Sequence, residues 1–139
     1  MDPANLIFFT VLLLVSSLIA AMLIRAAVTL LNRFVWSQSP VREPLFTEAF
    51  GIAAMTFLIG TFAGSLVAGM LEIDGRSPRH AIMLMYASIP MNVIVLAALT
   101  AYKLQTSFGR GLAVSALQTA LQFLIAAGCF TIYALAGGL

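Results

Sequence analysis

Four long stretches without a charged side chain are the feature that most constrains this sequence. They cover residues 3–24, 49–71, 81–102 and 111–139. An α-helix rises about 1.5 Å per residue, so about 20 apolar residues cross the roughly 30 Å of hydrocarbon in a bilayer. Each stretch reaches that length. The sequence therefore predicts an all-α, polytopic membrane protein with four transmembrane helices in a small bundle.

The composition and the local patterns agree with this class. Hydrophobic residues make up 62% of the chain and charged residues only 9%, whereas charged residues make up about 25% of soluble domains. Residues 11–15 read VLLLV and lack the alternation of a β-barrel strand. Asp2 is the only charge before the first stretch, which does not fit a signal peptide. We expect one membrane domain over residues 1–139, with spans at about 4–24, 48–71, 79–102 and 111–135.

A tail at residues 25–36 extends the first predicted helix. Its polar and amphipathic side chains share one side at 100° per residue, opposite an apolar side. The residues on the polar side are Arg25, Thr29, Asn32, Arg33 and Trp36. We expect this tail to lie at the membrane interface, with Arg25 reaching toward water and Trp36 at the depth of the headgroups.

The distribution of Lys and Arg predicts the orientation in the membrane. The first and third connections hold five of them, namely Arg25, Arg33, Arg42, Lys103 and Arg110. The second connection holds two, Arg76 and Arg79. Cytoplasmic loops carry an excess of basic residues. The sequence thus predicts both termini on the non-cytoplasmic side of a membrane of the bacterial inner-membrane type.

Two helix faces are candidate packing surfaces. Small residues recur at every fourth position of the second span, at Thr56, Gly60, Gly64 and Ala68. Such a ridge lets helix backbones approach closely in lipid. We expect it to contact helices of the same chain, and contact with another subunit is the alternative.

The second candidate face is a stripe of polar and small residues along the fourth span. It runs through Gly111, Ser115, Gln118, Thr119, Gln122, Ala126, Cys129 and Tyr133. Asn92, just after Pro90 in the third span, has an amide at similar depth. Because unpaired amides are costly in hydrocarbon, we predict a hydrogen bond from Asn92 to Gln118 or Gln122.

The sequence has no pattern of an active site. It lacks the motifs of nucleophile elbows, zinc proteases and phosphate loops, so we predict no catalytic residues and no enzyme activity. His80 is the only histidine and a candidate ligand for a pigment or haem, although we favour a hydrated position at the interface. With Glu72 and Asp74 it forms no specific metal motif, so we predict no metal site. We predict no cofactor, although the grooves leave room for a bound lipid or pigment.

Two functional hypotheses follow. The first is a non-catalytic accessory or structural subunit of a larger membrane protein complex, which acts through the packing of transmembrane helices. The alternative is a small homo-oligomeric transporter or channel whose path is lined by Ser115, Gln118 and Gln122. In either case the partners are the lipid bilayer and other membrane chains, with no soluble substrate identified. A net charge of +2 without a basic run gives no indication of nucleic acid binding.

Overall fold

All regular structure in the described part of the chain is helical. The computed structural model describes residues 3–70 and 78–136, with side chains described for 6–67, 69–70 and 88–136. Four helices occupy these ranges: α1 (Pro3–Phe34), α2 (Phe46–Met70), α3 (Pro78–Lys103) and α4 (Phe108–Leu135). Each predicted span overlaps one helix. The predicted all-α class is confirmed.

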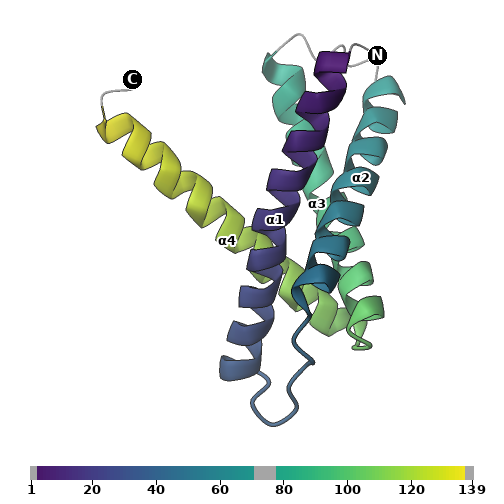
Figure 1. Cartoon of the computed structure of the whole chain (residues 1–139), viewed down its shortest axis with the longest axis vertical. Helices are drawn as coiled ribbons and strands as arrows, with labels where there is room; N and C mark the ends of the chain where they lie inside the picture. The colour runs from purple at the N-terminus through teal and green to yellow at the C-terminus, as the bar shows by residue number, and fades with distance from the viewer. Residues whose placement is uncertain (1–2, 71–77, 137–139) are drawn as a thin grey trace.

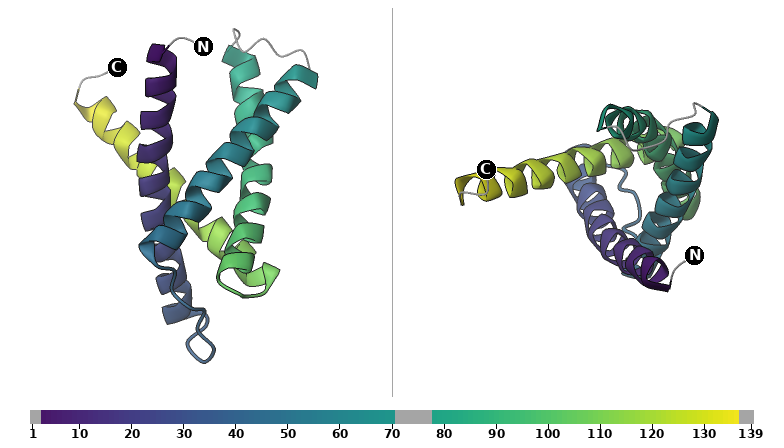
Figure 2. Two further views of the ribbon diagram at one scale, coloured as in Figure 1. Left: turned by 45° about the vertical axis from the view of Figure 1, so that its right-hand side comes forward. Right: turned by 90° about the horizontal axis from the view of Figure 1, so that it is seen from above.

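The four helices run alternately up and down (Figure 1). Contacts join α1 to α2, α2 to α3, α3 to α4 and α4 back to α1, so the order around the bundle follows the chain. Seen from above in Figure 2, α4 continues away from the other three helices toward its C-terminal end. The described helices therefore form a ring near the α1–α2 connection that opens where α4 departs.

The described core lies in the closed part of the ring. Its buried side chains come from the C-terminal part of α1, the start of α2, the end of α3 and the start of α4. They include Ala21, Ile24, Ala27, Val28, Ala49, Ile52, Ala53, Leu96, Leu104 and Val114. Because many of these side chains are small or β-branched, the helices approach closely with little side-chain freedom to lose.

Within the described residues, three helices are long and apolar enough to cross a membrane. They are Leu6–Phe34 in α1, Phe46–Val67 in α2 and Phe108–Leu135 in α4. Within the residues that were described, α3 contributes a shorter apolar helix, Ser88–Lys103. Many large apolar side chains of these helices face outward, as expected of a surface surrounded by lipid tails. This arrangement is compatible with an integral membrane protein.

A tight turn at Gln105 joins α3 to α4. The N–H of Thr106 donates to Ala101 O at 3.0 Å and the N–H of Gln105 to Tyr102 O at 3.4 Å, the two bonds of a Schellman motif. Gln105 has φ 49°, in the left-handed region. Ser107 then caps α4, since its Oγ accepts from the N–H of Arg110 at 3.4 Å. The turn brings α4 directly back against α3.

Candidate helix-packing site

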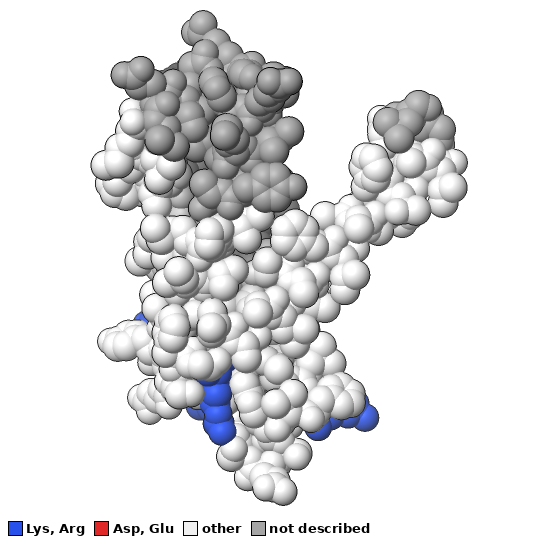
Figure 3. Space-filling view, turned by 180° about the vertical axis from the view of Figure 1, so that it is seen from behind, with Lys and Arg blue, Asp and Glu red and all other residues white. Residues whose placement is uncertain are grey.

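On the face drawn in Figure 3, the described basic side chains lie in the lower half of the bundle, toward the α1–α2 and α3–α4 connections. Arg42, in the α1–α2 connection, forms a bidentate pair with Glu48, with both N–O distances 2.9 Å. The hydrogen bond and charge of Glu48 raise the pKa of Arg42 above its ordinary value. Arg42 also donates to Lys103 O at 3.3 Å. This arginine therefore links the α1–α2 connection to the end of α3.

A second arginine links the same connection to the start of α4. The guanidinium of Arg110 donates to Ser39 O at 3.1 Å and to Ser39 Oγ at 2.7 Å. It also lies over the ring of Trp36, 5.3 Å from the centroid, which is within the range of a cation–π contact. The α1–α2 and α3–α4 connections are thus held side by side.

The predicted interfacial residues have two different environments. Arg25 is exposed, and Arg33 is exposed with its guanidinium 5.7 Å from the ring of Phe34. Asn32 instead binds the chain, because its Nδ2 donates to Val41 O at 2.7 Å and its Oδ1 accepts from Val41 N at 2.8 Å. Trp36 is half-buried beneath Arg110. Asn32 and Trp36 therefore hold the α1–α2 connection in place.

The small-residue ridge of α2 is used only in part within the chain. Gly60 is buried, and a Cβ at this position would meet the amide of Asn92 on α3, with Asn92 Cγ at 3.0 Å. One turn away, a Cβ on Gly64 would have nothing within 4 Å. Thr56 Oγ1 donates to Ile52 O at 2.8 Å, and the side chain of Ala68 lies outside the described residues. Among the described residues, the ridge contacts α3 at Gly60, and none comes within 4 Å of a Cβ placed on Gly64.

The first half of the α4 stripe is packed tightly against α3. Ser115 is fully buried and its Oγ donates to Val93 O at 2.8 Å. Gln118 is also buried, with 4% of its surface exposed. Gly111 allows the closest approach, since a Cβ there would collide with Ala97 O and lie 3.2 Å from Ala101 N. These three stripe residues form an interface within the chain.

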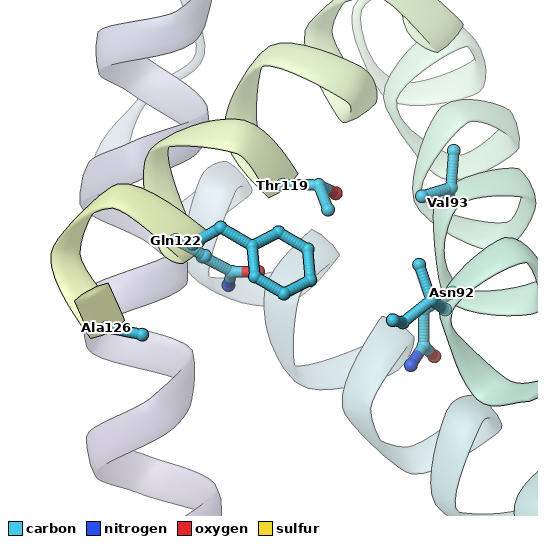
Figure 4. Close-up of a pocket in the computed structure, with 7 residues that line it drawn as sticks. Asn92, Val93, Thr119, Gln122 and Ala126 are labelled. Carbon is cyan, nitrogen blue, oxygen red and sulfur yellow. The ribbon is translucent and has the colours of Figure 1, made fainter. Parts of the chain in front are cut away.

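A pocket opens between α3 and α4 where the two helices begin to separate (Figure 4). Its volume is about 230 Å³, and it is lined by Ile89, Asn92, Val93, Thr119, Gln122, Phe123 and Ala126. The lining combines two amides and a hydroxyl with apolar side chains and contains no ionisable group.

The predicted hydrogen bond from Asn92 to Gln118 or Gln122 does not occur among the described residues of this structure. Asn92 and Gln122 line the same pocket, but Asn92 Oδ1 is buried without a hydrogen-bond partner among the described residues. The amide of Asn92 lies against Gly60 of α2, where the missing side chain leaves room for it. The equal depth of the two amides on α3 and α4 was therefore not sufficient to pair them.

Beyond the pocket that it lines with α3, the second half of α4 separates from the other described helices. Residues 122–133 are all exposed, and Figure 1 shows this part of α4 extending away from α1 and α3. Large apolar side chains such as Leu124 and Ile132 have 68% and 69% of their surface exposed. The same is true of the polar stripe, including Gln122, Cys129 and Tyr133. We call residues 121–135 the α4 arm.

The candidate ligand His80 lies in α3, but its side chain is outside the described residues, as are Glu72 and Asp74. In the part of the chain that was described, no group of three or more potential metal-ligating side chains occurs. The prediction for His80 stays a prediction.

Comparison with known proteins adds no assignment. No protein family, curated protein or solved structure matches this chain. The functional proposal therefore rests on the geometry of the described residues.

Sequence reasoning missed the residues that hold the closed end together. Glu48 accepts from Leu45 N at 2.9 Å, as a glutamate in the first turn of a helix commonly does. That pattern was visible in the sequence. Arg110 gave no comparable signal, because its partner Ser39 is 71 residues away. Nothing in the pattern distinguished it from the other basic residues.

Proposed function

We propose that this protein is a non-catalytic accessory subunit of a larger membrane protein complex and acts by packing its transmembrane helices against other chains. The observation that carries the proposal is the α4 arm. Its polar stripe is exposed, although the same stripe is buried against α3 in the first half of the helix. A polar helix face in hydrocarbon favours association with another helix.

The connections support four membrane spans in this proposal. Arg42 reaches Lys103 O and Arg110 reaches Ser39, so the α1–α2 and α3–α4 connections lie at the same end of the bundle. The chain between these connections must then cross the membrane an even number of times. Because α2 is long and apolar enough to cross, we infer that α3 crosses as well. The bundle then inserts as a single membrane domain.

The positions of the basic residues support one orientation of the chain in the membrane. Arg33, Arg42, Lys103 and Arg110 lie in or next to the α1–α2 and α3–α4 connections, and Arg25 lies nine residues before the end of α1. The positive-inside rule assigns an end with this many basic residues to the cytoplasm. The start of α1 and the end of α4 lie toward the opposite end (Figure 1). We therefore propose a membrane of the bacterial inner-membrane type with both termini on the non-cytoplasmic side.

The burial of two stripe residues of α4 favours a packing role over transport. Ser115 and Gln118 are buried against α3, and the hydroxyl of Ser115 is bound to Val93 O. A solute path lined by both residues would require this interface to separate. The closed interface therefore supports a structural use of the stripe.

Native mass spectrometry after gentle extraction from the source membrane tests the proposal. We expect this chain to copurify with different chains at a fixed stoichiometry. Recovery of the chain alone, as a monomer or a homo-oligomer that moves a solute in liposomes, would overturn the subunit role and support the transport alternative.

A further inference from the structure

Three uncharged polar side chains line the pocket between α3 and α4, and none of them has a hydrogen-bond partner among the described residues. They are Asn92, Thr119 and Gln122. Thr131, on the same helix as Thr119, is bound within the chain, because its Oγ1 donates to Ala127 O at 2.9 Å. The hydroxyl of Thr119 instead turns toward α3 across the pocket (Figure 4). Because unpaired polar groups are costly in hydrocarbon, the three side chains favour a ligand that binds them.

The depth of the pocket restricts the kind of ligand. In the four-span arrangement proposed above, Asn92 lies 11 residues before Lys103, the last residue of α3. This separation is about 16 Å along the helix, or half of the roughly 30 Å of hydrocarbon. A phospholipid headgroup stays at the membrane surface and does not reach this depth. The ligand is therefore a molecule whose polar group dissolves in the hydrocarbon.

The lining selects a neutral ligand that accepts hydrogen bonds. None of the seven described residues that line the pocket is ionisable, so they offer no counter-charge to an ionic group. The amide of Gln122 and the hydroxyl of Thr119 are donors. Asn92 Oδ1 is buried against Gly60, so its Nδ2 is the atom that remains for a ligand. Phe123 adds an aromatic side chain to the same lining, which suits a flat ring.

We propose that this pocket binds the ring of a lipid-soluble quinone. A quinone is neutral, dissolves in hydrocarbon and carries two carbonyl oxygens on a flat ring, which match the donors and the aromatic side chain of the lining. The volume of about 230 Å³ is below the roughly 300–1,000 Å³ of pockets that enclose a whole ligand. The ring therefore lies inside, and its tail leaves where α3 and α4 separate. Because the lining residues have no proton to donate at neutral pH, the pocket holds the quinone without protonating it.

This inference goes beyond the proposed function and depends only on the four membrane spans. Gln122 belongs to both the pocket and the α4 arm, whereas Cys129 and Tyr133 lie beyond the pocket and remain available to another chain. Loss of the subunit role would leave the pocket in place. Loss of quinone binding would leave the subunit role in place.

Photolabelling in lipid nanodiscs tests the site. The chain is reconstituted in phosphatidylcholine, the probe is an azido-substituted benzoquinone with a decyl tail, and mass spectrometry locates the adducts. We expect labels in α3 and α4 around residues 89–93 and 119–126. Decylbenzoquinone should displace the probe about tenfold better than decylbenzene, which has the same tail without carbonyl groups. Equal displacement by the two compounds would show that the pocket takes only hydrocarbon, and labels spread over all four helices would show no site. Either result would overturn the inference.

Matched variants test the hydrogen bonds. Thr119→Val keeps the shape of the side chain and removes its donor, and Gln122→Leu removes the amide. Each should raise the concentration of decylbenzoquinone that displaces half of the probe about 3- to 20-fold, the range of one intramembrane hydrogen bond. Thr131→Val is the control and should change nothing, because the Thr131 hydroxyl is bound to Ala127 O outside the pocket. Equal effects at positions 119 and 131, or none at 119 and 122, would contradict quinone binding by these groups.

Discussion

Gly111 is the residue at which α4 comes closest to α3. A Cβ there would collide with the backbone carbonyl of Ala97, and a backbone atom cannot turn aside as the end of a side chain does. Gly111→Ala should therefore push the helices apart and lower the free energy of unfolding by about 1–3 kcal/mol. Unfolding in mixed micelles, followed by circular dichroism, measures the change.

Gly109→Ala is the matched control for this prediction. It lies in the first turn of the same helix, and a Cβ there would have nothing within 4 Å. Its unfolding free energy should stay within about 0.5 kcal/mol of the unmodified chain. Equal effects at positions 109 and 111 would mean that helix propensity, and not the contact with Ala97, controls the result.

Gln105 adopts a left-handed conformation that glycine tolerates better. Its φ of 49° closes the turn between α3 and α4, and this conformation costs a residue with a Cβ roughly 1–2 kcal/mol. Because glycine also has more freedom to lose on folding, Gln105→Gly should raise the free energy of unfolding by up to about 1 kcal/mol. Gln105→Ala keeps the Cβ and should give no gain. If both variants behave alike in the same unfolding assay, the backbone conformation of this residue is not limiting.

At the scale of elements, Arg110 at the start of α4 binds the α1–α2 connection. Its guanidinium binds Ser39 and lies over Trp36, the only tryptophan of the chain. Arg110→Lys removes the planar group while keeping the charge. We expect increased quenching of Trp36 fluorescence by acrylamide and a loss of about 0.5–1 kcal/mol of stability.

The control for the fluorescence measurement is Arg33→Lys. The Arg33 guanidinium lies over Phe34, so the emission and quenching of Trp36 should stay unchanged in this variant. An unchanged Trp36 signal in Arg110→Lys would show that the cation does not shield the indole in the folded protein.

The positions of the helices could be predicted from the sequence because charged residues, prolines and small polar residues mark where the helices end. Charged residues are costly in hydrocarbon, so the ends of the last three uncharged stretches lie within four residues of the ends of α2, α3 and α4. The helix α1 continues ten residues beyond the first stretch, to the connection whose prolines and small polar residues do not favour helix. The pairing of side chains between helices could not be predicted. Asn92 and Gln122 have matching depth, but the rotation of α3 directs Asn92 toward Gly60. Helix rotation depends on all neighbouring contacts at once.

At the scale of the whole molecule, the inclination of α4 agrees with its length. Its 28 residues extend about 42 Å, which is longer than the roughly 30 Å of bilayer hydrocarbon. A helix that is too long accommodates by tilting. Since α4 is held to α3 near its start, its tilt moves the α4 arm away from α1 and α3 (Figure 2). Length alone does not explain this departure, since α1 has 32 residues and stays in the bundle; α4 departs beyond its close contacts with α3 at Gly111 and Ser115.

The topology of the whole chain can be tested with single cysteines in a Cys129→Ala background. Gln38 and Gly109 are exposed near the two connections that Arg42 and Arg110 hold together, and Ser77 lies in the α2–α3 connection, outside the described residues. A membrane-impermeant maleimide is added to intact cells and then to permeabilised cells. Because basic connections remain in the cytoplasm, we expect Ser77→Cys to react in intact cells and Gln38→Cys and Gly109→Cys to react only after permeabilisation.

Each alternative topology gives a different labelling pattern. If α3 did not cross the membrane, Gln38→Cys and Gly109→Cys would lie on opposite sides, and only one of them would react in intact cells. That result would also contradict the contact between Arg110 and Ser39, which requires both connections on one side. If the orientation were inverted, both would react and Ser77→Cys would be protected. The proposal of four membrane spans would still hold. The five basic residues would then not determine the orientation of the chain in the membrane.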